Sequence, residues 1–257
     1  MHFNEADEVH LASLGLGRGV SERATWQAGD LVRGVGAALL LFFFVTFAIA
    51  GPFLAAYGED SGEFALGQAL AVSVFDASIV FVAYRLARGR GAGWRELGLQ
   101  PPTGRWRGGR LLGLVLIGYL GAILLVNAYG FAVEALGLED LLPTRQLDEE
   151  FFEHDWVLPL LGFSLVVMAP FAEEVFFRGF IYAGLRRRLA ILPAALVSGA
   201  LFALAHGQPG LIIPFTGVGA ILAYAYERTG TLAAPIGVHF LFNLISFLAL
   251  VFISELR

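Results

Sequence analysis

The fold is decided by a short polar interruption of an apolar run, at residues 171–179: Phe171-Ala172-Glu173-Glu174-Val175-Phe176-Phe177-Arg178-Gly179. Two adjacent carboxylates follow the apolar residues 156–171, and an arginine comes four positions after the second carboxylate. At the centre of a bilayer, one ionisable group costs about 2.5–3.5 kcal/mol on insertion scales. A membrane segment that holds two of them needs partners for both. We therefore expect a membrane protein with a polar reaction centre between its helices.

The composition is that of a membrane protein. Of the 257 residues, 57% are hydrophobic and 15% are charged, and the mean hydropathy is +0.71. Soluble domains are about 45–50% apolar and about 25% charged. There is no cysteine, which excludes disulfides and thiolate chemistry. The net charge of -5 and the lack of a basic patch argue against a nucleic-acid partner and leave the lipid bilayer as the expected surroundings.

The predicted fold class is all-α, a polytopic bundle of transmembrane helices with a polar intramembrane cavity. Residues 1–30 are predicted to form a polar N-terminal arm, because they lack the basic-then-apolar order of a secretory signal. Residues 31–155 hold the N-terminal transmembrane helices and loops, and residues 156–250 hold the helices with the polar residues. We expect seven spans, with eight as the alternative count, at residues 34–56, 64–86, 111–135, 156–172, 191–206, 211–226 and 232–253.

Arginine bias in the short loops predicts the orientation. The two basic connections are the loop at 85–110 and the cluster at 186–188, and two spans separate them. Both can therefore face the cytoplasm, with the acidic loop at 136–155 outside. This predicts a multi-pass protein of the plasma (inner) membrane with a cytoplasmic N-terminus.

The two carboxylates of the central stretch differ in their local partners. Neighbouring positions of an α-helix are about 100° apart, so Glu173 and Glu174 cannot point the same way. Glu174 and Arg178 are four apart and share a face, where an ion pair can form. Glu173 is left without a local cation, which makes it the candidate for acid and base work. The alternative is a purely structural ion-pair cluster at the membrane edge.

Two further polar sites follow in the last spans. His206 ends an apolar helix, where a histidine is often only a cap. His239 and Asn243 are four apart on one face of an otherwise apolar span, where polar pairs can simply join helices. Together with Glu173 they supply a carboxylate, two imidazoles and a carboxamide.

A single aspartate, Asp76, lies within the second span. An interhelical hydrogen bond to Ser73, Ser78 or Tyr84 explains it, and a share in the active site is the alternative.

This set of side chains suits peptide hydrolysis. A carboxylate and a histidine can hold a water molecule and remove its proton, while a second histidine and an amide can stabilise an oxyanion. The alternative is a zinc ion on Glu173, His206 and His239, although the compact His-Glu-x-x-His signature is missing. Two other classes of function are open. A proton-coupled transporter also uses buried Glu, His and Arg but predicts an inverted repeat, and a membrane scaffold or bacteriocin-immunity protein needs no catalysis.

The ordered motifs resemble those of the CAAX-processing and bacteriocin-processing intramembrane proteases (CPBP or Abi family), the Rce1-like type II CAAX prenyl endopeptidases. The resemblance rests on Glu173-Glu174 with Arg178, on Phe202 with His206, and on His239 with Asn243, and it covers about residues 156–247. Residues 93–99 also resemble a segment that often precedes this domain.

The resemblance implies an intramembrane endopeptidase, either a metalloprotease or a metal-free glutamate enzyme. Glu173 would be the catalytic glutamate and His206 its partner on the water, while His239 and Asn243 would form the oxyanion site. Glu174 and Arg178 would organise the helix end. The expected partner is a membrane-associated peptide or protein tail, and the expected cofactor is zinc or none.

Overall fold

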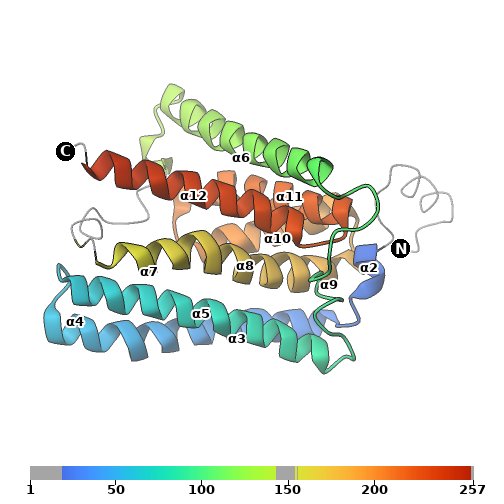
Figure 1. The fold of residues 1–257 in the computed structure, drawn as a ribbon, viewed down its shortest axis with the longest axis horizontal. Coiled ribbons are helices and arrows are strands. Elements are labelled where there is room, and N and C mark those ends of the chain that lie inside the picture. The colour runs from blue at the N-terminus through green and yellow to red at the C-terminus, as the bar shows by residue number, and fades with distance from the viewer. Residues whose placement is uncertain (1–18, 143–153, 155, 256–257) are drawn as a thin grey trace.

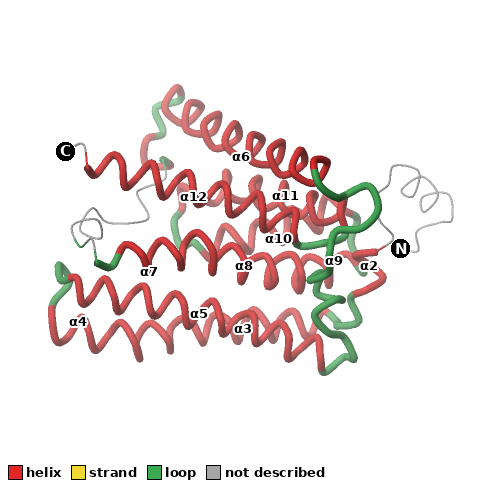
Figure 2. The backbone as a smooth tube through the Cα atoms, in the orientation of Figure 1, coloured by secondary structure: helices red, strands yellow, loops and turns green. Residues whose placement is uncertain are grey.

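The computed structural model describes residues 19–142, 154 and 156–255, and every regular element in them is helical (Figures 1 and 2). The predicted all-helical bundle is thereby confirmed. Most of the predicted polar arm, residues 1–18, and much of the acidic loop, residues 143–153 and 155, lie outside the described residues. The principal helices are α2 (Gly19–Arg23), α3 (Ala28–Val45), α4 (Gly51–Tyr57), α5 (Gly62–Arg88), α6 (Gly109–Ala135), α7 (Leu158–Phe163), α8 (Ala169–Glu173), α9 (Ala183–Arg186), α10 (Ile191–Ala205), α11 (Ile212–Thr229) and α12 (Ala233–Glu255).

Six helical segments of the described chain are long and apolar enough to cross a membrane. They are Ala28–Tyr57, Gly62–Arg88, Gly109–Ala135, Leu158–Arg186, Pro209–Thr229 and Ala233–Phe252. The fifth predicted span corresponds to α10, which has only 15 residues. At 1.5 Å per residue α10 is about 22 Å long, which is less than the hydrocarbon thickness of about 30 Å. This helix therefore packs within the bundle and does not match the full width of a bilayer.

The segment that carries the two glutamates lies in the middle of the bundle. Figure 1 shows α7, α8 and α9 between the pair α3 and α5 on one side and the group α10, α11, α12 and α6 on the other. Helix α5 packs against α8. Helix α12 packs against α8 and against the π-helical stretch Ser164–Met168, which precedes α8. Elements from both halves of the chain therefore surround the central segment.

The end of the predicted polar arm is packed into the bundle from residue 19 onward. Val20 and Trp26 are fully buried, and the Trp26 indole Nε1 donates a hydrogen bond of 2.8 Å to the Phe180 carbonyl. The Trp26 ring also stacks on Phe180, with 5.6 Å between the centroids. These contacts fix the start of α3 against the helix that holds the glutamates.

The loop before α6 closes one end of the same helix. The Leu97 carbonyl oxygen would lie only 2.5 Å from a Cβ at Gly179, so a glycine is needed where this loop crosses the helix. The Leu232 amide donates to the Gly98 carbonyl at 3.0 Å, and the Thr231 hydroxyl donates to the Gln100 carbonyl at 2.6 Å. The loop therefore joins the central helix to the turn between α11 and α12.

Candidate active site

The central helix runs from Leu158 to Arg186 and contains two π-helical stretches. The first is Ser164–Met168, and the second, Glu174–Tyr182, begins directly after Glu173. Wide π-helical turns inside α-helices are frequent at functional sites. The predicted span ended at residue 172, but the helix continues through both glutamates. This correction has a physical reason: every residue from Glu174 to Tyr182 is buried, so the charges meet protein partners rather than lipid.

Glu174 and Arg178 form the ion pair that their spacing predicts. The Arg178 Nη1 donates to Glu174 Oε1 at 2.8 Å, and both side chains are fully buried. The Nη2 of Arg178 donates to the Gly219 carbonyl of α11 at 3.2 Å. Its guanidinium also lies 4.5 Å from the centre of the Phe202 ring. Because the charge is paired and hydrogen-bonded, this cluster can exist in an apolar interior.

His239 of α12 reaches both glutamates. Its Nδ1 lies 3.0 Å from Glu174 Oε1, and its Nε2 lies 3.9 Å from Glu173 Oε2. A carboxylate oxygen can only accept, so Nδ1 carries the proton that this short contact needs. The contact fixes the ring and directs Nε2 toward Glu173. The imidazole of His239 on α12 therefore lies close to both carboxylates of the central helix.

Glu173 differs from Glu174 in its exposure. Its side chain is 20% exposed, whereas that of Glu174 is 0% exposed. The Glu173 Oε2 atom is nevertheless buried and, like the Glu174 Oε2 atom, has no hydrogen-bond partner among the described residues. Buried polar atoms are usually satisfied, and an exception at a candidate site calls for a functional explanation. Glu173 therefore combines limited access with an unused acceptor.

Within the described residues, Asp76 makes none of the hydrogen bonds to Ser73, Ser78 or Tyr84 that the sequence predicts. Its side chain is buried, and its Oδ2 has no partner among the described residues. The Ser73 hydroxyl bonds instead with the Ser164 hydroxyl at 2.7 Å, and the Ser78 hydroxyl donates to the Val74 carbonyl. Tyr84 stacks on Trp94. Asp76 is close enough to Glu173 to interact with it electrostatically, because α5 packs against α8.

His206 lies at the end of α10 and is held by Phe202. The ring Nδ1 of His206 is 2.8 Å from the Phe202 carbonyl oxygen, so Nδ1 donates and the neutral ring keeps its lone pair on Nε2. The His206 and Phe202 ring centroids are 4.7 Å apart, and the His239 ring is 5.7 Å from Phe202. The two histidines therefore share an aromatic neighbour. No hydrogen bond or ion pair joins His206 to Glu173 in the described part of the chain.

Asn243 lies one turn beyond His239 on α12. Its amide Nδ2 donates a hydrogen bond of 2.8 Å to the Leu165 carbonyl, in the first π-helical stretch. In a π-helix the backbone carbonyl groups have different hydrogen-bond partners from those in an α-helix. Here the Leu165 carbonyl accepts a hydrogen bond from a side chain of another helix. An amide nitrogen has two hydrogens, so one donor remains available.

In the structure, one connected cluster is formed by Glu173, Glu174, Arg178 and His239. His206 contacts the Phe202 ring, which also contacts His239. Asn243 lies on the same helix as His239. Sequence reasoning missed the role of the Phe202 ring, which contacts Arg178 and both histidines; only the family resemblance singles it out. Within the residues that the structure describes, no three His, Asp or Glu side chains are arranged to hold a metal ion. A zinc ion on Glu173, His206 and His239 stays a prediction.

Comparison with known proteins gives a family match in the C-terminal half and two similar proteins. Residues 155–245 match the family model described as Type II CAAX prenyl endopeptidase Rce1-like. The chain is 36% identical over 92 residues to "Membrane-embedded CAAX protease MroQ" of Staphylococcus aureus (strain USA300), which covers 34% of this chain and 37% of that protein. It is 28% identical over 86 residues to "Putative membrane peptidase YdiL" of Bacillus subtilis (strain 168), covering 34% and 35%.

The chain thus spans about a third of the length of the curated relatives that it matches. No solved structure gives a significant match. The matched segment contains Glu173, Glu174, Arg178, His206, His239 and Asn243, and the apolar helices around it make this an integral membrane protein. Over residues 155–245, the chain is therefore similar to the Rce1-like type II CAAX prenyl endopeptidase family.

Proposed function

We propose that the protein is an intramembrane endopeptidase that hydrolyses a peptide bond in a membrane-associated peptide or protein tail. One observation carries the proposal: His239 lies between Glu173 and Glu174, at 3.9 Å and 3.0 Å, inside the segment that matches the protease family. The two named relatives are described as a protease and a putative peptidase, which supports the same class of reaction.

The hydrogen bonds of the two histidines support different roles. The His206 Nδ1 bonds to a carbonyl, so its Nε2 can accept a hydrogen bond from a water molecule. The His239 Nδ1 bonds to the Glu174 carboxylate, and in the protonated ring Nε2 is a second donor. Glu173 and His206 would therefore orient the water, and His239 would donate to the oxyanion. The remaining N–H of Asn243 is a second donor on the same helix face.

The proposed reaction uses this chain's own groups. Glu173 removes a proton from the water as the oxygen attacks the scissile carbonyl carbon. The carbonyl oxygen becomes an oxyanion, which accepts hydrogen bonds from His239 and Asn243. When the C–N bond breaks, the protonated Glu173 returns the proton to the leaving nitrogen. The immediate products are a carboxylic acid and an amine, and the proton of the acid then passes to the amine to give a carboxylate and an ammonium group.

The surroundings of Glu173 favour a substrate that comes from the membrane. Glu173 belongs to the helix Leu158–Arg186, which is one of the six apolar segments long enough to span a bilayer. Its partly exposed side chain is open to a peptide, whereas the buried Glu174 is not. A water-soluble protein could not reach this depth without entering the bilayer. We place the arginine-rich end and the N-terminus on the cytoplasmic side of the plasma membrane, as arginine bias predicts.

The metal-free form of the proposal predicts that chelation leaves cleavage intact. The purified full chain, reconstituted in lipid, is assayed against a panel of membrane-tethered fluorogenic peptides, before and after dialysis against a strong chelator. Because no described triad of donors fits a metal, the rate is expected to stay within about twofold. Loss of activity on chelation, with recovery on addition of zinc, would support the zinc form instead. Cleavage of none of the peptides at any metal concentration would favour the scaffold function.

A further inference from the structure

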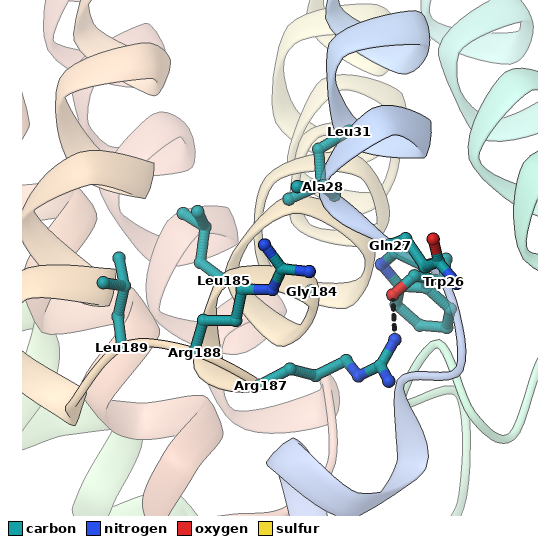
Figure 3. Close-up of a pocket in the computed structure, with 9 residues that line it drawn as sticks. All are labelled: Trp26, Gln27, Ala28, Leu31, Gly184, Leu185, Arg187, Arg188 and Leu189. Carbon is teal, nitrogen blue, oxygen red and sulfur yellow. Dashed lines mark hydrogen bonds between the residues drawn. The ribbon is translucent and has the colours of Figure 1, made fainter. Parts of the chain in front are cut away.

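A pocket of about 360 Å³ lies at the end of the bundle where α3 begins and α9 ends (Figure 3). One wall comes from Trp26 and Leu31 at the start of α3, and the other comes from Leu185 and the turn at 187–189. None of the predicted catalytic residues lines it. Figure 3 shows the side chains of both walls directed toward the same space.

The pocket is built on fixed groups. The Trp26 indole is held by its hydrogen bond to the Phe180 carbonyl. A Cβ at Gly184 would lie 2.7 Å from the Trp26 Nε1 and 2.8 Å from Leu31, so only a glycine permits this packing. The pocket is therefore preformed, and a ligand would not have to order its walls.

The three consecutive arginines after α9 have different partners. Arg186 is neutralised by Glu227, with Nη2 to Oε1 at 3.0 Å. Arg187 donates from Nη1 to the carbonyls of Thr25 and Trp26, which are uncharged acceptors. The guanidinium of Arg188 has no hydrogen bond or ion pair within the described residues, and Figure 3 shows it extending between the two walls. Two cations thus face the pocket, and no acidic side chain is among the described residues that line it.

Apart from Gln27, the remainder of the lining is apolar. Leu31, Leu185 and Leu189 line the pocket. On the same helix as Leu31, the side chains of Val32 and Leu40 are 73% and 74% exposed, as expected for a helix that faces acyl chains. A ligand that fits this site has a compact anion at one end and hydrocarbon at the other.

We propose that this pocket binds the phosphate headgroup of an anionic phospholipid, with Arg187 and Arg188 on the phosphate and the leucines against the start of an acyl chain. Guanidinium groups suit phosphate oxygens because they present several donors in a plane. Basic pockets between transmembrane helices are known sites for anionic headgroups. The bound lipid would link the start of α3 to the end of the glutamate-bearing helix. This proposal does not depend on the proteolytic function.

Native mass spectrometry of the full chain in detergent tests the proposal, with dioleoyl phosphatidylglycerol compared against dioleoyl phosphatidylcholine. We expect the anionic lipid to bind more tightly. Arg188→Gln is expected to weaken its binding about fivefold, the effect of one arginine near a headgroup. Arg188→Lys is expected to keep most of the affinity, because it keeps the charge.

The matched control is Arg88→Gln, which removes an exposed arginine from the last turn of α5 without touching the pocket. This variant is expected to bind the anionic lipid as the unchanged chain does. Equal binding of the two lipids, or equal losses in Arg188→Gln and Arg88→Gln, would overturn the proposal. Displacement of the lipid by inorganic phosphate at equal concentration would also overturn it, because the site would then select a soluble anion.

Discussion

Glu173→Gln is expected to slow peptide cleavage by about 10³-fold while the protein stays folded. The substitution keeps the size of the side chain and removes only its ability to take up a proton. The Glu173 Oε2 atom makes no hydrogen bond within the described residues, so the substitution breaks no hydrogen bond at that atom. The measurement is kcat/KM in lipid on a membrane-tethered peptide, together with the unfolding temperature.

The matched control for this prediction is Glu134→Gln, which changes an exposed glutamate at the end of α6. It is expected to cleave at the rate of the unchanged chain. If Glu173→Gln kept more than about a tenth of that rate, Glu173 would not be the general base, since positioned bases contribute about 10²–10⁴. A large fall in the unfolding temperature of Glu173→Gln would assign the residue a structural role instead.

Arg178→Met is expected to lower the free energy of unfolding by about 3–5 kcal/mol. The change leaves the fully buried Glu174 carboxylate without its cation and the Gly219 carbonyl without its donor. An exposed arginine such as Arg88 offers the contrast, because Arg88→Met is expected to change the stability by about 0.5 kcal/mol or less. Denaturant unfolding in micelles compares the two variants.

The double variant Glu174→Gln with Arg178→Met separates loss of charge pairing from loss of packing. When both charges are removed, the cost is expected to be smaller than the sum of the two single substitutions, because no unpaired charge is left buried. Additive losses would mean that the two side chains do not stabilise each other. That outcome would contradict the ion pair as the reason why the glutamates are tolerated inside the bundle.

The parts of the site that were predictable from sequence are those set by local geometry. Glu174 and Arg178 are four positions apart on one helix, so their pairing follows from helix periodicity alone. The all-helical bundle follows equally from the length and apolar character of the segments. The same spacing leaves Glu173 without a local cation, whereas the roles of the two histidines came from the family resemblance.

The remainder depends on tertiary contacts that periodicity does not contain. His239 meets both glutamates because α12 packs against α8, and no local rule predicts which helices are neighbours. Asp76 lacks the serine partner expected for it, because Ser73 bonds to Ser164 of a different helix. Trp26 is buried although it follows a polar segment, because its indole finds the Phe180 carbonyl across 154 positions of sequence. Helix α10 is apolar enough to be predicted as a membrane span, but it is shorter than the helices that can cross a bilayer.

A kinetic double-mutant cycle tests whether Glu173 and His239 act on the same peptide bond. The value of kcat/KM is measured for the unchanged chain, Glu173→Gln, His239→Gln and the double variant, on one membrane-tethered peptide. Because residues that act as a unit are not additive, the double variant is predicted to be about as slow as the slower single variant. If the two losses multiply independently, or if His239→Gln keeps the full rate of the unchanged chain, then Glu173 and His239 do not act together on one peptide bond.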